Sequence, residues 1–133
     1  MKVGFGADHA GFELKQHLIE TAKSLGHEPV DFGTYAADSV DYPDFAEPVA
    51  RATVAGEVEL GVVICSNGVG VSIVANKVPG ARAALCHTHW GAERARHGNP
   101  GRRGEHQERH WQVSHCRQDR KQSWRVINGR VIK

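Results

Sequence analysis

Short apolar runs alternate with longer amphipathic stretches along the first part of the chain. The run from Lys2 to Ala7 predicts a short buried strand, and in residues 12–25 apolar side chains recur at steps of three and four, which predicts a helix ending before Gly26. Residues 27–32 then restart as a strand. Strand, helix and strand in this order form a βαβ unit, which implies a parallel sheet with a right-handed crossover.

The alternation continues to residue 97. A loop is predicted over 33–44, and a helix is predicted over 45–55. The continuous, β-branched run from Leu60 to Cys65 is typical of a central parallel strand that is covered on both faces. A turn over 66–70, a helix from Val71, a strand over 81–86 and a helix over 89–97 complete the order. The sequence therefore predicts an α/β fold, a doubly wound three-layer sandwich with a parallel, Rossmann-like sheet.

The pattern changes after residue 97. Residues 98–104 (GNPGRRG) are rich in residues that break regular structure, and residues 105–123 are polar without a clear apolar period. Strand character returns only in residues 124–132. We therefore divide the chain into an α/β domain over 1–97, an atypical basic segment over 98–123 and a returning strand of the same domain over 124–133. The C-terminal part is expected to be truncated or irregular.

Charge divides the chain at almost the same place. Residues 1–93 contain 6 Lys and Arg against 12 Asp and Glu, whereas residues 94–133 contain 11 against 3. A basic tail on an acidic body can serve an anionic substrate or nucleic acid. A solvated basic segment is the simpler interpretation, and we expect no nucleic-acid partner; a nucleic-acid-associated protein remains the alternative.

Cysteine use and the absence of long apolar runs bear on location. The three cysteines, Cys65, Cys86 and Cys116, lie far apart and form no disulfide framework, which favours a reducing compartment. No apolar run approaches the roughly 20 residues of a membrane-spanning helix, and no signal peptide is evident. We expect a cytoplasmic protein without a membrane partner.

The best candidate for chemistry is the thiol of Cys65. It stands where a buried strand is predicted to end, and Ser66-Asn67-Gly68-Val69-Gly70 turns from there into a helix. Backbone N–H groups of such a turn and the helix dipole create a positive potential that favours an anion, and the same potential favours a thiolate. The alternative is that Cys65 is a small buried apolar residue and the turn only a tight connection.

Further polar residues are predicted at the same edge of the sheet. Asp8 and His9 follow the first strand, and Tyr42 lies in the loop after the second. In open α/β sheets, ligands bind outside the carboxyl ends of the strands, where these residues and Cys65 are expected to meet. No cluster has the spacing of metal ligands, so we expect neither a metal nor another cofactor.

Several motifs resemble the B-type ribose-5-phosphate isomerases, whose family also includes the galactose-6-phosphate isomerase subunits. They are GADHAGFELK at 6–15, DYP at 41–43, ICSNGVGVSIVANK at 64–77 and RAALC at 82–86, within residues 1–97. The resemblance implies a metal-independent aldose–ketose isomerase that converts ribose 5-phosphate and ribulose 5-phosphate through an enediolate. It also implies a homodimer or a dimer of dimers, although the exact sugar phosphate stays open.

The resemblance also implies a role for individual residues. Cys65 would be the base, since Val71 stands where another branch of the family has Glu. Asn67 would bond the reacting oxygens, and backbone N–H groups around Gly68, Val69 and Gly70, next to Ser66, would hold the enediolate. Asp8 and His9 would bind sugar hydroxyls and phosphate, and Tyr42 would line the ring site.

The chain departs from the family pattern near residue 98. Asn99 matches an Asn that reaches the partner subunit's site, but Gly98 stands at the position of the ring-opening His, with His97 one residue early. The motif GRVI, which carries a phosphate-binding arginine (here Arg130), follows about 20 residues late. An insertion, a retained non-coding stretch or a frame shift would explain this. A catalytically impaired member that only binds sugar phosphate is therefore the second hypothesis.

Overall fold

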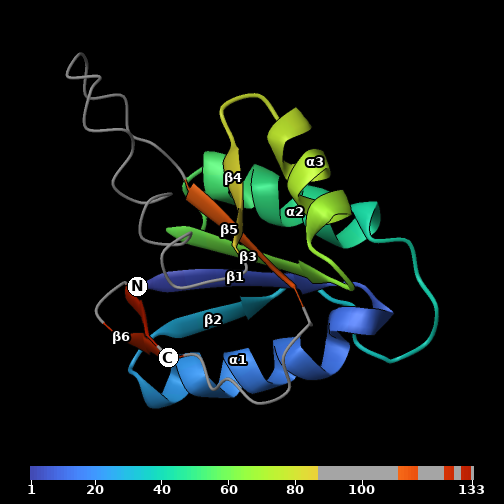
Figure 1. The fold of residues 1–133 in the computed structure, drawn as a ribbon. Helices are drawn as coiled ribbons and strands as arrows, with labels where there is room; N and C mark the ends of the chain where they lie inside the picture. The colour runs from blue at the N-terminus through green and yellow to red at the C-terminus, as the bar shows by residue number, and fades with distance from the viewer. Residues whose placement is uncertain (87–110, 117–124, 128–129, 133) are drawn as a thin grey trace.

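A computed structural model describes residues 1–86, 111–116, 125–127 and 130–132 of the chain, the last three ranges by their backbone. Its centre is a five-stranded sheet in the order β2-β1-β3-β5-β4, with parallel pairing at every interface (Figure 1). The strands are β1 (Lys2–Ala7), β2 (Glu28–Asp31), β3 (Leu60–Cys65), β4 (Arg82–Cys86) and β5 (Trp111–Cys116). The predicted parallel α/β fold is thereby confirmed.

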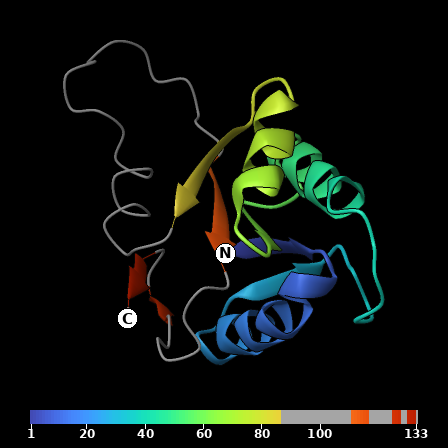
Figure 2. The same ribbon diagram turned by 45° about the vertical axis from the view of Figure 1, so that its right-hand side comes forward.

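Helices cover both faces of this sheet. Helix α1 (Phe12–Ser24) lies on one face, and α2 (Pro43–Val54) and α3 (Val69–Lys77) lie on the other (Figures 1 and 2). Alternate side chains of β3 serve the two cores: Val62 packs with the cluster of β1 and α1, and Val63 packs with that of α2 and α3. Burial on both faces explains why β3 is apolar without interruption.

The direction in which strands are added reverses between β1 and β3. The chain passes from β1 to β2 on one side and then returns to place β3 on the other side of β1. In the β1–β3 register, Ala7 pairs with Ile64, so Asp8 and Cys65 follow at the same level. This carboxyl edge is the switch point at which open α/β sheets bind ligands.

Helix boundaries differ slightly from the prediction. Helix α2 begins at Pro43, two residues before the predicted start, because proline is well suited to the first turn of a helix, where its missing N–H costs nothing. Helix α3 begins at Val69 instead of Val71, directly after Gly68, whose φ of 77° ends the turn. The helix predicted over 89–97 lies outside the described residues.

The C-terminal third differs more from the prediction. Strand β5 comes from the segment 98–123, which we set apart as an atypical basic segment, and it pairs between β3 and β4. Apolar and polar residues alternate only over Trp111–Val113 before the polar flanks resume, which is too short a pattern to stand out.

The end of the chain also forms a different element from the one expected. Strands β6 (Arg125–Ile127) and β7 (Arg130–Ile132) pair with each other, antiparallel, in a separate two-stranded sheet. The expectation of one returning strand needs correction. The sequence does carry a signal for the observed hairpin. Asn128-Gly129, between two Arg-Val-Ile runs, is the dipeptide that most favours a two-residue hairpin turn.

Candidate active site

Cys65 closes β3 with its side chain turned toward the layer of α2 and α3. Only 3% of its surface is exposed, and it packs in the cluster that contains Val49 and Val71. The turn of residues 66–68 then leads into α3, so the thiol lies directly before a helix N-terminus. The predicted strand–turn–helix around Cys65 is therefore present.

Two neighbours contact the sulfur. The backbone N–H of Gly68 donates to Cys65 Sγ at 3.1 Å, and the thiol lies 3.8 Å from Asn67 Oδ1, to which it donates. Asn67 Oδ1 also accepts the N–H of Val69 at 3.0 Å. The sulfur therefore accepts a backbone N–H close to the positive end of the dipole of α3.

These contacts bear on the N–H groups expected to hold an enediolate. In this structure the N–H of Gly68 is directed at the sulfur and that of Val69 at Asn67. Both N–H groups of the turn therefore bond side chains of the turn itself, those of Cys65 and Asn67. Ser66, which follows Cys65, is exposed at the same turn.

Asp8 joins the ends of β1 and β3. Its N–H donates to the carbonyl of Ile64 at 3.2 Å, and its Oδ1 accepts the N–H of Gly11 at 3.0 Å, which caps the short 3₁₀ helix η1 (His9–Gly11). A Cβ on Gly11 would lie 2.7 Å from Ile64 Cγ2, so η1 packs directly on the end of β3. Asp8 is 7% exposed and stands next to the level of Cys65.

His9 and Tyr42 supply an exposed wall to this edge. His9 Nδ1 accepts the N–H of Val40 at 3.3 Å, so a neutral imidazole carries its proton on Nε2. The Tyr42 ring covers Gly70 at the start of α3: a Cβ there would lie 2.8 Å from Tyr42 Cζ. Tyr42 therefore reaches the turn that follows Cys65, as its position in the sequence predicts.

Three predicted site residues remain: His97, Asn99 and Arg130. His97 and Asn99 lie outside the described residues. Arg130 belongs to β7, and the β6–β7 sheet lies near the start of β1, at the opposite end of the strands from Cys65 (Figure 1). The described residues contain no group of three His, Cys, Asp or Glu side chains that would hold a metal ion, and none of their helices has the length and apolar character for a membrane span.

Comparisons with known proteins place this arrangement in context. The chain is 43% identical to ribose-5-phosphate isomerase B of Escherichia coli over 98 residues, which cover 74% of this chain and 66% of that protein. It is 55% identical to ribose-5-phosphate isomerase B of Mycobacterium tuberculosis over 87 residues, 64% of this chain and 53% of that protein. The chain thus spans between about half and two thirds of the length of these relatives.

Solved structures agree with the sequence matches. A ribose-5-phosphate isomerase B of Clostridium thermocellum superposes with a TM-score of 0.73 at 45% identity, covering 84% of this chain and 70% of that one. A ribose 5-phosphate isomerase of Thermotoga maritima gives a TM-score of 0.75 at 37% identity, covering 85% and 72%. The family model described as Ribose/Galactose Isomerase matches residues 3–102. The chain belongs to the Ribose/Galactose Isomerase family.

Proposed function

We propose that this protein interconverts ribose 5-phosphate and ribulose 5-phosphate, with Cys65 as the base. The observation that carries the proposal is the N–H of Gly68 directed at Cys65 Sγ, 3.1 Å away, at the switch point of the sheet. The E. coli and M. tuberculosis relatives, which are named for this activity, support it. The chain belongs to the same family and aligns with them through this turn.

The proposed reaction moves one proton between two carbons. The Cys65 thiolate takes the proton from C2 of the open-chain aldose, and the electron pair of that bond forms the enediolate. The resulting thiol returns the proton to C1 as the hydroxyl proton passes from O2 to O1, so that the thiolate is restored and no redox partner is needed. General-base help of this kind contributes typically 10²–10⁴-fold.

The turn after Cys65 would stabilise the charge that develops on the oxygens. Asn67 is held by the bond from Val69 N–H to its Oδ1, which leaves its Nδ2 hydrogens as the donors that we assign to the enediolate. Helix α3, 9 residues long, adds the positive end of its dipole next to Gly70. These groups would act without a metal ion.

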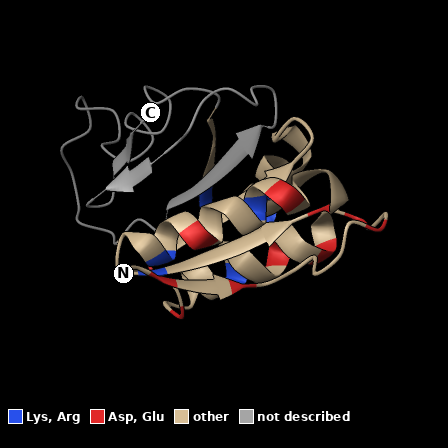
Figure 3. Cartoon of the chain, turned by 90° about the horizontal axis from the view of Figure 1, so that it is seen from below, with Lys and Arg blue, Asp and Glu red and all other residues tan. Residues whose placement is uncertain are grey.

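Asp8, His9 and Tyr42 are assigned to substrate binding. The carboxylate of Asp8 would accept a sugar hydroxyl, and His9 Nε2 and the Tyr42 ring would line the opening. Asp and Glu outnumber Lys and Arg, 11 to 6, in residues 1–86, whose charges Figure 3 colours, so that part offers the phosphate little positive charge. We assign the remaining positive charge that the phosphate requires to the start of α3, to His9 and to the basic residues after residue 93.

A second copy of the chain is the partner that we propose. Helix α3 carries exposed apolar side chains at Val69 (44%) and Ile73 (52%), one turn apart, and Leu85 in the edge strand β4 is 37% exposed. Because α3 begins at the Cys65 turn, a copy that covers this face would also adjoin the site. The free thiol of Cys65 fits a reducing compartment, and we propose the cytoplasm.

The experiment compares two cysteine variants in an assay of ribulose 5-phosphate formation. Cys65→Ala should lose at least a hundredfold in kcat, whereas Cys86→Ala, which removes the other described buried thiol, should keep normal turnover. The sequence at Gly98 favours one alternative, a family member that binds sugar phosphate without turnover. In that case the wild-type protein shows a ligand-induced rise in Tm but no product.

A further inference from the structure

Lys15 is a buried cation that the proposed mechanism does not use. It stands near the start of α1 and has 0% of its surface exposed, and the other buried charged side chain among the described residues is Asp8. Burying an ammonium group costs much free energy unless hydrogen bonds and an opposite charge compensate it. The groups that compensate this cost therefore show which parts of the structure Lys15 holds together.

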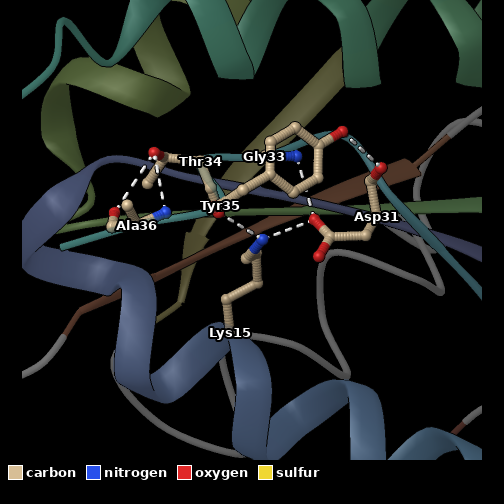
Figure 4. Close-up of polar contacts among 6 residues, drawn as sticks. All are labelled: Lys15, Asp31, Gly33, Thr34, Tyr35 and Ala36. Carbon is tan, nitrogen blue, oxygen red and sulfur yellow. Dashed lines mark hydrogen bonds and ion pairs between the residues drawn. The ribbon is translucent and has the colours of Figure 1, made fainter. Parts of the chain in front are cut away.

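The hydrogen-bond and ion-pair partners of Lys15 come from the end of β2 and the loop after it (Figure 4). Lys15 Nζ donates to the carbonyl of Thr34 at 2.7 Å and forms an ion pair with Asp31. The ring of Tyr35 lies 5.3 Å from Nζ and adds a cation–π contact. One ammonium group thus joins α1 to the end of β2 and to two positions of the loop that follows.

Thr34, whose carbonyl bonds Lys15, is linked in turn to the end of β1 through the preceding peptide. Thr34 N–H donates to the carbonyl of Ala7 at 2.8 Å, and Ala7 N–H donates to the carbonyl of Gly33 at 2.8 Å. Asp31 Oδ1 also accepts the N–H of Gly33 at 2.9 Å (Figure 4). These bonds fix the first residues of the loop immediately beside Asp8.

The far end of the same loop forms the wall of the candidate site. Val40 N–H bonds His9 Nδ1, and the Tyr42 ring covers Gly70. Between the two ends, residues 35–39 are exposed, so little packing fixes their path. The path of the loop therefore depends on the bonds at its two ends, and those made by Lys15 hold the first of them.

We propose that Lys15 is a positioning residue for substrate binding. Through Thr34 and Asp31 it fixes the start of the 33–42 loop, and through the loop it fixes the places of His9 and Tyr42, without touching the substrate itself. This inference rests on the proposed isomerase function. It differs from a purely structural role because it assigns Lys15 an effect on KM that is separate from its effect on stability.

The first test replaces the ammonium group with an apolar chain of similar length. Lys15→Met should raise KM for ribose 5-phosphate roughly five- to tenfold, which corresponds to the loss of one or two hydrogen bonds, while kcat stays within about twofold because the Cys65 turn is untouched. Ile19→Ala is the matched control. Ile19 lies on the same helix and is buried against Val3 and Phe5, so its replacement should lower Tm without changing KM. An unchanged KM in Lys15→Met would overturn the proposal.

Two further variants separate the ion pair from the bond to Thr34. Asp31→Asn removes the charge but keeps an oxygen for Gly33 N–H and leaves Lys15 bonded to Thr34, so KM should stay within about twofold. Lys15→Met leaves the Asp31 carboxylate without its ion pair, which should lower Tm. The double variant Lys15→Met/Asp31→Asn removes both charges and should recover this loss of Tm. Its KM should remain raised roughly five- to tenfold, since Thr34 still lacks its donor. A normal KM in the double variant would show that Lys15 only balances charge.

Amide hydrogen exchange gives a readout that needs no isomerase activity. In Lys15→Met, or in the double variant if the single one does not fold, residues 34–42 should exchange faster than in the wild-type and Ile19→Ala proteins. If the wild-type protein shows no isomerase activity and Lys15→Met still exchanges faster, the isomerase proposal is refuted and the role of Lys15 in anchoring the loop is retained. Unchanged exchange in the Lys15 variants would refute the anchoring role, whatever the activity. If neither Lys15 variant folds, the proposal is also overturned, because Lys15 is then required for the fold as a whole.

Discussion

The backbone N–H of Gly68 is directed at the sulfur of Cys65, 3.1 Å away. This contact exists because Gly68 adopts a φ of 77°, a left-handed conformation that places its N–H over the end of β3 before α3 begins. Hydrogen bonds to a charged group are worth about 1.5–3 kcal/mol. In the proposed mechanism, this contact would stabilise the thiolate form of Cys65 during proton abstraction.

Gly68→Ala tests the importance of this contact. A Cβ strains the left-handed backbone by about 1 kcal/mol and shifts the N–H away from the sulfur, so we expect kcat to fall roughly ten- to hundredfold. Gly26→Ala and Gly56→Ala are matched controls, because their φ values are 78° and 76° and a Cβ meets nothing within 4 Å at either position. The controls should lose similar stability with full activity. Equal losses of kcat in all three would contradict the assignment.

Gly70→Ala tests the place of Tyr42. The new Cβ would lie 2.8 Å from Tyr42 Cζ and must displace the ring, so we expect KM for the sugar phosphate to rise about three- to tenfold. In a Tyr42→Ala background, adding Gly70→Ala should cost no further binding, because the ring that it displaces is absent. A double-mutant cycle measures this coupling. Additive effects on KM would show that Tyr42 and Gly70 act separately.

Metal removal should leave the activity unchanged. The groups assigned to the enediolate are Asn67 Nδ2 and the N-terminal end of α3, and the described residues hold no cluster with metal-ligand character. Dialysis against a strong chelator, followed by assay in chelator-treated buffer, measures the effect. Loss of turnover that a divalent ion restores would require a different account of how the enediolate is stabilised.

Strong periodicity in the first 86 residues made most of the fold predictable. The run from Leu60 to Cys65 matches β3 residue for residue, since a strand buried on both faces needs apolar side chains at every position. The placement of Asp8 beside Cys65 follows from the switch point between β1 and β3. Local pattern and global topology agree there, which is why the sequence was sufficient.

Long-range pairing and buried polar contacts were harder to predict. Nothing local to Trp111–Cys116 indicates that β5 inserts between β3 and β4, because strand order depends on pairing partners distant in sequence. Lys15 reads as an ordinary polar residue of an amphipathic helix, yet it is fully buried. Its burial depends on Asp31 and the Thr34 carbonyl, which approach it only once β2 is in place.

Gly98 stands at the position where the resemblance to the B-type isomerases implies a histidine that opens the sugar ring. Positions 97 and 98 lie outside the described residues. If the imidazole is missing there, ring opening loses its acid–base help, whereas proton transfer by Cys65 is unaffected. The enzyme must then wait for the small open-chain fraction of the substrate, and its kcat/KM for ribose 5-phosphate should be low. Gly98→His should raise kcat/KM on ribose 5-phosphate roughly 10²-fold or more and leave a substrate that cannot cyclise nearly unchanged, because only the cyclic substrate needs the added group. His97→Ala is the informative partner variant. A large loss of activity in His97→Ala, with no gain in Gly98→His, would show that His97 already opens the ring from one residue earlier.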